Sequence, residues 1–252
     1  MKAKKSFGQH FLKNTHLTAN MARDIKAHQA HNRILEVGPG KGILTHDLLE
    51  IADRFRAVEL DRDMIDYLLT EGILDESQLI REDFLKLELE EVFEGESFTL
   101  VGNYPYNISS QIVLKMLHHH HLIPFAMGMF QLEMARRITG SMNTKDYGSL
   151  SILTQLFYDC KIIYKVKPGD FAPPPKVHSA VVRFVRKEVL PDLSIEVLEK
   201  YLRRSFAHRR KKIKNNLQAD PEIEILNEMD LADLRAEQIP MDVFVELIRK
   251  LG

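Results

Sequence analysis

The chain contains almost no cysteine and no long apolar run, and each absence excludes a class of protein. Its one cysteine, Cys160, excludes a disulfide framework and a zinc site built on cysteine, and it is typical of a reducing compartment. No apolar run in the chain approaches the ~18 residues of a membrane span. No apolar region of signal-peptide type follows the N-terminal lysines. We therefore expect a soluble, cytoplasmic protein that is not bound to a membrane.

Acidic residues are missing from one segment of a chain whose net charge is only −1. Residues 200–218 contain eight Lys and Arg and no Asp or Glu. Crowded like charges repel and need a compensating polyanion, of which nucleic acid is the first candidate, although a solvated surface is the alternative. We assign RNA contacts to the following residues of this segment: Arg203, Arg204, Arg209, Arg210, Lys211, Lys212 and Lys214. The N-terminal arm with Lys2, Lys4 and Lys5 either adds to the same field or is disordered.

Strand-like and helix-like segments alternate along most of the chain. Buried strands are predicted at residues 33–37, 55–60, 79–80, 98–101 and 126–130, and helices at 45–51, 64–69, 109–117 and 131–139. This alternation predicts an α/β fold in which helices cover both faces of a parallel sheet. Strands at 161–166 and 180–185 predict an antiparallel hairpin at the sheet edge. Beyond residue 188 the pattern is only helical, so we expect two domains, 1–188 and 189–252.

A glycine cluster, Gly38-Pro-Gly40-Lys-Gly42, separates the first predicted strand from the next helix. Glycine permits a tight turn and lets a ligand approach the backbone, although such turns also serve packing alone. The G-x-G-x-G spacing differs from the G-x-G-x-x-G of pyrophosphate binders, and no phosphate loop is present. Glu59, at the end of the second strand, can accept hydrogen bonds from both hydroxyls of a ribose. These features favour a nucleoside without phosphates, such as S-adenosylmethionine, whose adenine amine Asp83 would then face.

A second motif, Asn103-Tyr104-Pro105-Tyr106, follows the strand predicted at 98–101. Parallel sheets bind ligands at the carboxyl ends of their strands, so this motif and the glycine cluster are expected at one site. The N6 lone pair of adenine is delocalised and becomes a better nucleophile when both N–H groups are held by acceptors. The Asn103 amide oxygen and the Tyr104 carbonyl can supply these acceptors, and Pro105 stiffens the turn. Tyr106 offers a face on which an extruded base can stack, although an ordinary turn is the alternative.

Six segments together resemble one known family. They are Phe7-Gly-Gln-His-Phe-Leu12, Glu36-Val-Gly-Pro-Gly40, Val58-Glu-Leu-Asp61, Asn103-Tyr-Pro-Tyr-Asn-Ile-Ser109, Phe171-Ala-Pro-Pro-Pro-Lys-Val177 and Arg209-Arg-Lys-Lys-Ile-Lys-Asn215. In this order they are similar to the ribosomal RNA adenine N6-dimethyltransferases, most closely those of the bacterial KsgA type. The resemblance covers about Lys5 to Leu217.

The resemblance implies a Rossmann-like class I methyltransferase domain with a small, all-helical, rRNA-contacting C-terminal domain. It implies transfer of methyl groups from S-adenosylmethionine to N6 of two adjacent adenosines in the 3′-terminal hairpin of 16S rRNA, within the 30S subunit or its precursor. The cofactor contacts that it implies are His10, Leu12, Gly38, Gly40, Glu59, Asp83 and Asn103. The catalytic positions are Asn103, Tyr104, Pro105, Tyr106 and Phe171, with the Phe171 ring on the side of the base opposite Tyr106. His10 departs from the commoner pattern, which has Asn there.

Other functions stay open at this point. An Erm-type enzyme shares these motifs but modifies 23S rRNA, and a factor that gates ribosome assembly would use catalysis only secondarily. A DNA adenine methyltransferase would need a base-reading domain that the sequence does not contain. The tract His118–His121 invites a metal, but consecutive residues of a helix point in different directions, so we expect no metal site there. No long coiled-coil pattern is present, and we expect a monomer.

Overall fold

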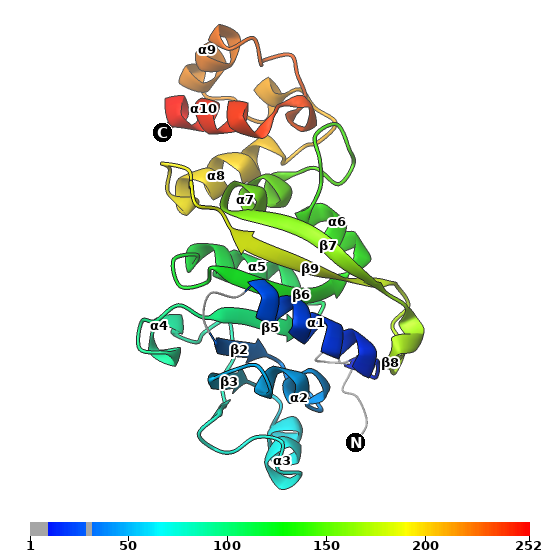
Figure 1. Ribbon diagram of the computed structural model, residues 1–252. Helices are drawn as coiled ribbons and strands as arrows, with labels where there is room; N and C mark the ends of the chain where they lie inside the picture. The colour runs from blue at the N-terminus through cyan, green and yellow to red at the C-terminus, as the bar shows by residue number, and fades with distance from the viewer. Residues whose placement is uncertain (1–9, 29–31) are drawn as a thin grey trace. The chain divides into compact units, whose positions relative to one another are not determined.

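The computed structural model describes residues 10–28 and 32–252 of the chain, and Lys2, Lys4 and Lys5 lie outside the described residues. The chain divides into two compact units (Figure 1). The first comprises Met1–Ala135 and Lys161–Arg186, and the second comprises Arg136–Cys160 and Lys187–Gly252. The second unit therefore includes residues 136–160 besides the C-terminal residues for which the sequence predicts a helical domain. The functional boundary between residues 188 and 189 stays a prediction.

A seven-stranded sheet of order β4-β3-β2-β5-β6-β9-β7 is built around the first unit (Figure 1). Pairing is parallel from β4 to β6, and β9 pairs antiparallel with β6. The strands are β2 (Arg33–Val37), β3 (Arg54–Val58), β4 (Leu79–Ile80), β5 (Thr99–Asn103), β6 (Phe125–Gln131), β7 (Tyr158–Val166) and β9 (Ser179–Arg186). The mostly parallel α/β fold that the sequence predicts is thus confirmed.

Helices cover this sheet because its central strands are apolar along nearly their whole length. In β2 the last four residues are buried, and in β5 the first four, which is typical of parallel strands that are covered on both faces. The helices of this part are α1 (Thr15–His28), α2 (Ile43–Leu49), α3 (Arg62–Thr70), α4 (Leu89–Val92), α5 (Ser109–His118) and α6 (Leu132–Ile138). Helix α1 packs against α2 and β6.

The predicted edge hairpin differs in detail from the expectation. The later strand, β9, lies inside the sheet beside β6, and the earlier strand, β7, is at the edge. The connection between them contains a 3₁₀ turn, η2 (Pro168–Asp170), and the short strand β8 (Phe171–Ala172). Strand β8 pairs antiparallel with β1 (Phe11–Leu12), with Leu12 opposite Phe171. This two-stranded sheet brings the start of the chain to the segment that precedes β9.

The second unit is helical, as the sequence predicts for the C-terminal residues. It contains α7 (Ser149–Phe157), α8 (Ile195–Ser205), α9 (Asp220–Glu228), α10 (Met241–Leu251) and the 3₁₀ turns η3 (Ile213–Asn215) and η4 (Ala236–Gln238). Helix α8 packs against α7 and α10, and Leu198, Leu202 and Phe244 are fully buried. Ser194 begins α8, because its side chain accepts a hydrogen bond from the Val197 N–H.

Candidate active site

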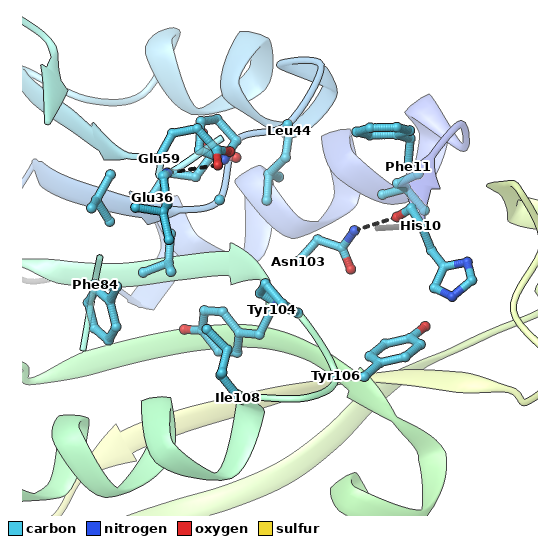
Figure 2. Close-up of a pocket in the computed structure, with 18 of the residues that line it drawn as sticks. His10, Phe11, Glu36, Leu44, Glu59, Phe84, Asn103, Tyr104, Tyr106 and Ile108 are labelled. Carbon is cyan, nitrogen blue, oxygen red and sulfur yellow. Dashed lines mark hydrogen bonds between the residues drawn. The ribbon is translucent and has the colours of Figure 1, made fainter. Parts of the chain in front are cut away.

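A cavity of about 320 Å³ lies in the first unit, within the usual size range of small-molecule sites (Figure 2). Its walls come from the segment before α1, the loop after β2, the ends of β3 and β4, and the residues that follow β5. The carboxyl ends of these parallel strands meet at one edge of the sheet. The predicted residues that line the cavity are His10, Leu12, Gly38, Gly40, Glu59, Asp83, Asn103, Tyr104, Pro105 and Tyr106.

The glycine loop after β2 has the backbone conformation that the sequence predicts. Gly38 and Gly40 have φ of 67° and 56°, in the left-handed region that side chains rarely adopt. A Cβ atom on Gly40 would lie 3.3 Å from the Phe11 ring. The loop and the segment before α1 therefore meet closely, and an alanine at Gly40 would strain the backbone and crowd this contact.

Two carboxyl groups at the ends of β2 and β3 face the cavity. Glu59 accepts hydrogen bonds from the Leu60 and Asp61 N–H groups, both at 2.9 Å and both on Oε1. Glu36 is fully buried and accepts one hydrogen bond, from the Thr45 hydroxyl at 2.7 Å. Burial raises the pKa of Glu36 to about 8 and also raises the pKa of Glu59, because the charged form loses hydration. The cavity therefore favours a positively charged ligand, which would compensate these carboxylates.

Asp83 follows β4, and its carboxyl group both lines the cavity and forms a turn. Its Oδ1 accepts a hydrogen bond from the Leu85 N–H at 3.0 Å. The Lys115 ammonium group holds the same loop, because it donates to the carbonyls of Leu85 and Leu87 at 3.1 and 2.5 Å. Burial lowers the pKa of Lys115. Lys115 of α5 therefore holds the loop that carries Asp83, a contact that no sequence motif indicates.

Asn103 is the last residue of β5, and its side chain reaches into the cavity (Figure 2). Its Nδ2 donates to the backbone carbonyl of His10 at 3.1 Å. That bond fixes the amide so that the Oδ1 atom is turned away from His10 and toward the tyrosines of the motif (Figure 2). The Tyr106 hydroxyl is 2.7 Å from the Ser179 hydroxyl, and its ring stacks on the His10 imidazole with a centroid distance of 5.5 Å.

Tyr104 forms part of the cavity wall with its side chain. The ring lies over two glycines that face each other across β5 and β6, Gly102 and Gly128, and its edge contacts Phe130. A Cβ atom on either glycine would overlap the ring. The Tyr104 hydroxyl is buried and has no hydrogen-bond partner among the described residues, and burial strongly raises its pKa. The sequence motif indicates a role only for the Tyr104 carbonyl, and the packing of the side chain on two glycines of separate strands has no local signal in the sequence.

Among the residues predicted to be catalytic, Phe171 does not line the cavity. Its ring is 1% exposed and belongs to the hydrophobic core with Leu12 and Val181. The pairing of β8 with β1 fixes this position. A ring enclosed by core side chains offers no face to a base in this arrangement, so the stacking role of Phe171 stays a prediction from the resemblance.

The predicted RNA-binding residues lie in the second unit and do not form one helix. Arg203 and Arg204 end α8, and the others lie in the turns that follow it. Several have partners in the same unit: Arg204 pairs with Glu222, Arg209 donates to the carbonyls of Thr144 and Lys145, and Lys212 and Lys214 pair with Asp233. Arg203, Arg210 and Lys211 are exposed and pair with no acidic group of the described chain. These three cations are therefore available to an external polyanion.

Within residues 10–28 and 32–252 no helix combines the length and the apolar character that crossing a bilayer requires. No group of three His, Cys, Asp or Glu side chains in the same ranges is arranged to hold a metal ion. His119 and His121 of the histidine tract lie 3.9 and 3.7 Å from Glu90.

The sheet order and the loop after β2 define a class of protein, the Rossmann-like methyltransferases. A solved dimethyladenosine transferase from Plasmodium falciparum shares the fold, with a TM-score of 0.81 and 23% identity over 94% of this chain and 96% of that chain. The solved structure of the 23S rRNA methyltransferase ErmE matches with a TM-score of 0.68 and 26% identity, over 96% of this chain and 99% of that chain. The sequence profile of the ribosomal RNA adenine dimethylases matches residues 1–248.

Curated relatives agree with this match. Two proteins called ribosomal RNA small subunit methyltransferase A are similar along the whole chain. The one from Flavobacterium johnsoniae is 39% identical over 100% of this chain and 96% of its own length. The one from Phocaeicola vulgatus is 40% identical over 100% of this chain and 90% of its own length. The chain belongs to the ribosomal RNA adenine dimethylase family, and the resemblance found in the sequence is confirmed.

Proposed function

We propose that this methyltransferase dimethylates N6 of two adjacent adenosines in the 3′-terminal hairpin of 16S rRNA, with S-adenosylmethionine as the methyl donor. The substrate is the 30S subunit or its precursor, and the protein acts in the cytoplasm as a monomer during small-subunit maturation. One observation carries the proposal: the Asn103 amide is fixed by the His10 carbonyl with its oxygen free at the cavity, beside the Tyr106 ring. The names of the curated relatives support the choice of small-subunit rRNA.

The lining of the cavity fits S-adenosylmethionine. When bound, this cofactor supplies an electrophilic methyl group on a positively charged sulfur. Glu59 accepts from the Leu60 and Asp61 N–H groups through Oε1, and its carboxylate also interacts with the Gly40 backbone. A carboxylate has enough lone pairs to accept from the ribose hydroxyls as well. Gly38 and Gly40 carry no side chain where the ligand must pass close to the loop. The buried carboxyl of Glu36 favours a cation, because a nearby positive charge compensates its ionised form.

The adenine is held from the other end of the cavity. Asn103 Oδ1 accepts one N6–H bond and thereby localises the nitrogen lone pair for attack. Because the His10 carbonyl holds Nδ2, the amide needs no reorientation when the base arrives. Tyr106 stacks on the extruded base, and its bond to Ser179 fixes the plane of the ring. Alignment of the nitrogen with the methyl carbon then accounts for most of the catalysis, and no general base is needed.

The second unit supplies contacts with RNA phosphates. Arg203, Arg210 and Lys211 are exposed and have no acidic partner among the described residues, so binding phosphates breaks no ion pair of theirs. Phosphate contacts position an RNA without specifying its sequence. These residues therefore dock the ribosomal particle, and the choice of adenosine belongs to the cavity.

The replacement Asn103→Ala tests whether the fixed Asn103 amide takes part in the reaction. Loss of one preorganised hydrogen-bonding group lowers kcat by about 10²–10³-fold in comparable sites. We expect a loss of this size in methyl transfer to undermethylated 30S subunits, with the Kd for the cofactor, measured by calorimetry, nearly unchanged. Asn20→Ala on α1, which does not line the cavity, is the matched control.

Two outcomes would contradict the role given to Asn103. Unchanged turnover would remove it from the reaction, and lost cofactor binding would make it a cofactor ligand instead. Normal ribosome maturation in cells that carry only Asn103→Ala would favour the alternative of an assembly factor with secondary catalysis.

A further inference from the structure

Acidic side chains outnumber basic ones in the lining of the cavity, and Lys41 is the one lysine or arginine among the described lining residues. Four carboxyl groups line the same space, those of Glu36, Glu59, Glu82 and Asp83. S-adenosylmethionine is positively charged at its sulfur and its amino group, but it also carries an α-carboxylate. An acidic lining repels that carboxylate, because like charges in a partly enclosed site are only weakly screened. The carboxylate therefore fits the part of the cavity where Lys41 lies.

The turn that carries Lys41 is fixed on both sides. Gly40 and Gly42 have φ of 56° and 76°, and the Gly42 N–H donates to the Pro39 carbonyl at 2.9 Å. A Cβ atom on Gly42 would lie 2.8 Å from the Ile73 side chain, so this end of the loop packs closely on the protein. The backbone of Lys41 is therefore held between two glycines at the cavity.

The side chain of Lys41 extends over the ring of Phe11. The ammonium nitrogen is 5.2 Å from the ring centroid, within the range of cation–π contacts. Phe11 packs closely against Gly40 and belongs to β1, which pairs with β8. No acidic group of the described chain pairs with Lys41. The aromatic contact thus holds the ammonium group in place without neutralising its charge.

Lys41 and Asp83 lie at opposite ends of the cavity. In Figure 2 Phe84, the neighbour of Asp83, is at one end of the drawn residues and Phe11 is at the other, with Asn103 between them. The Asp83 end is the one predicted to receive the adenine of the cofactor, and Asn103 is predicted to act at the methyl group. The end formed by Phe11 and Lys41 is then left for the amino-acid part of the cofactor.

We propose that the Lys41 ammonium binds the α-carboxylate of S-adenosylmethionine and thereby sets which way round the cofactor lies in the acidic cavity. This role rests on the proposed function, which supplies the identity of the cofactor. An ammonium–carboxylate hydrogen bond is charge-assisted and stronger than one between neutral groups. A phosphate of the RNA is the other anion that an ammonium could hold. The position of Lys41 in the cavity lining, partly buried, favours the cofactor.

Two substitutions of Lys41 separate its charge from its packing on Phe11. Lys41→Met removes the charge and keeps an unbranched side chain, and Lys41→Arg keeps the charge. Calorimetry without RNA should give a Kd for S-adenosylmethionine about 10-fold weaker in the Met variant and within about 2-fold of the wild type in the Arg variant, because one charge-assisted bond is lost or kept. The melting temperatures of the unliganded proteins should agree. Lys26→Met, at an exposed lysine of α1 outside the cavity, is the matched control.

Decarboxylated S-adenosylmethionine shows whether Lys41 acts on the carboxylate itself. The wild type should bind this compound more weakly than S-adenosylmethionine, and Lys41→Met should lose about 10-fold of that preference, since the two changes remove the same interaction. An unchanged Kd for S-adenosylmethionine in Lys41→Met would overturn the inference, as would a variant that keeps the whole preference.

Steady-state kinetics with 30S subunits completes the test. The Met variant should have a KM for S-adenosylmethionine raised about 10-fold and an unchanged kcat and KM for the subunits. A raised KM for the subunits with an unchanged cofactor Kd would overturn the inference and make an RNA phosphate the ligand of Lys41. The calorimetry contains no RNA, so failure of the wild type to methylate 30S subunits would contradict the proposed function separately from the role of Lys41.

Discussion

Replacing Glu36 with glutamine should remove a loss of stability that the unliganded protein suffers as the pH rises. The carboxyl group of Glu36 is fully buried at the end of β2, with one hydrogen bond from Thr45 and with the Glu59 carboxyl nearby. Burial raises its pKa from 4.5 to about 8. Below pH 4.5 the group is protonated in both the folded and the unfolded chain and has no effect on the pH dependence of stability.

Between pH 4.5 and 8 the unfolded chain ionises at Glu36 and the folded protein does not. The folded state therefore loses stability progressively over this window, and the loss is complete once the pH exceeds the folded pKa. A pKa raised from 4.5 to about 8 corresponds to at most about 5 kcal/mol of folding stability. Glutamine has the same shape, can still accept the Thr45 hydrogen bond and does not ionise.

Thermal unfolding of the wild type and Glu36→Gln from pH 5 to pH 9, without cofactor, measures this effect. The two proteins should have similar melting temperatures at pH 5, and the variant should become the more stable one by pH 8. The difference should reach on the order of 10 °C and then level off. Glu82→Gln, at an exposed carboxylate of the same cavity, should follow the wild type. A constant difference between Glu36→Gln and the wild type across the pH range would refute the reasoning.

Three further predictions follow from the contacts around the cavity and on the second unit. Glu59→Gln should weaken S-adenosylmethionine binding by about 1.5–3 kcal/mol, because one charged acceptor is lost, and an unchanged calorimetric Kd would contradict the ribose contact. Gly128→Ala should destabilise the protein by about 1–3 kcal/mol, since the new Cβ overlaps the Tyr104 ring. Gly169→Ala, where a Cβ meets open space, should leave the melting temperature unchanged. Reversing charge at Arg210 and Lys211 should weaken rRNA binding and reduce the slope of log K against log salt by about 2; an equal slope would remove them from the RNA surface.

Most of the sheet is predictable from the sequence, because long apolar strands alternate with helical segments. The strands predicted at residues 33–37 and 98–101 are both present, and the structure pairs them as β2 and β5 in parallel. Strands β1 and β8 have two residues each and show no periodicity, so their pairing was not foreseeable. The sequence predicts only helices beyond residue 188, whereas α8 ends at Ser205 and the basic segment continues in turns. The positive charges that follow Ser205 repel one another on a helix and separate in turns.

The candidate site was predictable where its residues end parallel strands, and less so elsewhere. Gly38 and Glu59 directly follow β2 and β3, and Asn103 ends the neighbouring strand β5, so sheet topology alone brings them together. The burial of Phe171 depends on the β1–β8 pairing, which no local pattern indicates. Glu36 was passed over, although an acidic residue inside an otherwise apolar strand is a signal for a buried, perturbed carboxyl group.

The central claim is tested most directly by transfer of labelled methyl groups from S-adenosylmethionine to three substrates in parallel. These are undermethylated 30S subunits, 50S subunits and naked 23S rRNA. The account predicts label in the 30S subunits alone, recovered as dimethyladenosine near the 3′ end of 16S rRNA. Label in 23S rRNA would contradict it and indicate an Erm-type enzyme. Absence of label from every substrate, with the cofactor still bound, would contradict it in favour of an assembly factor.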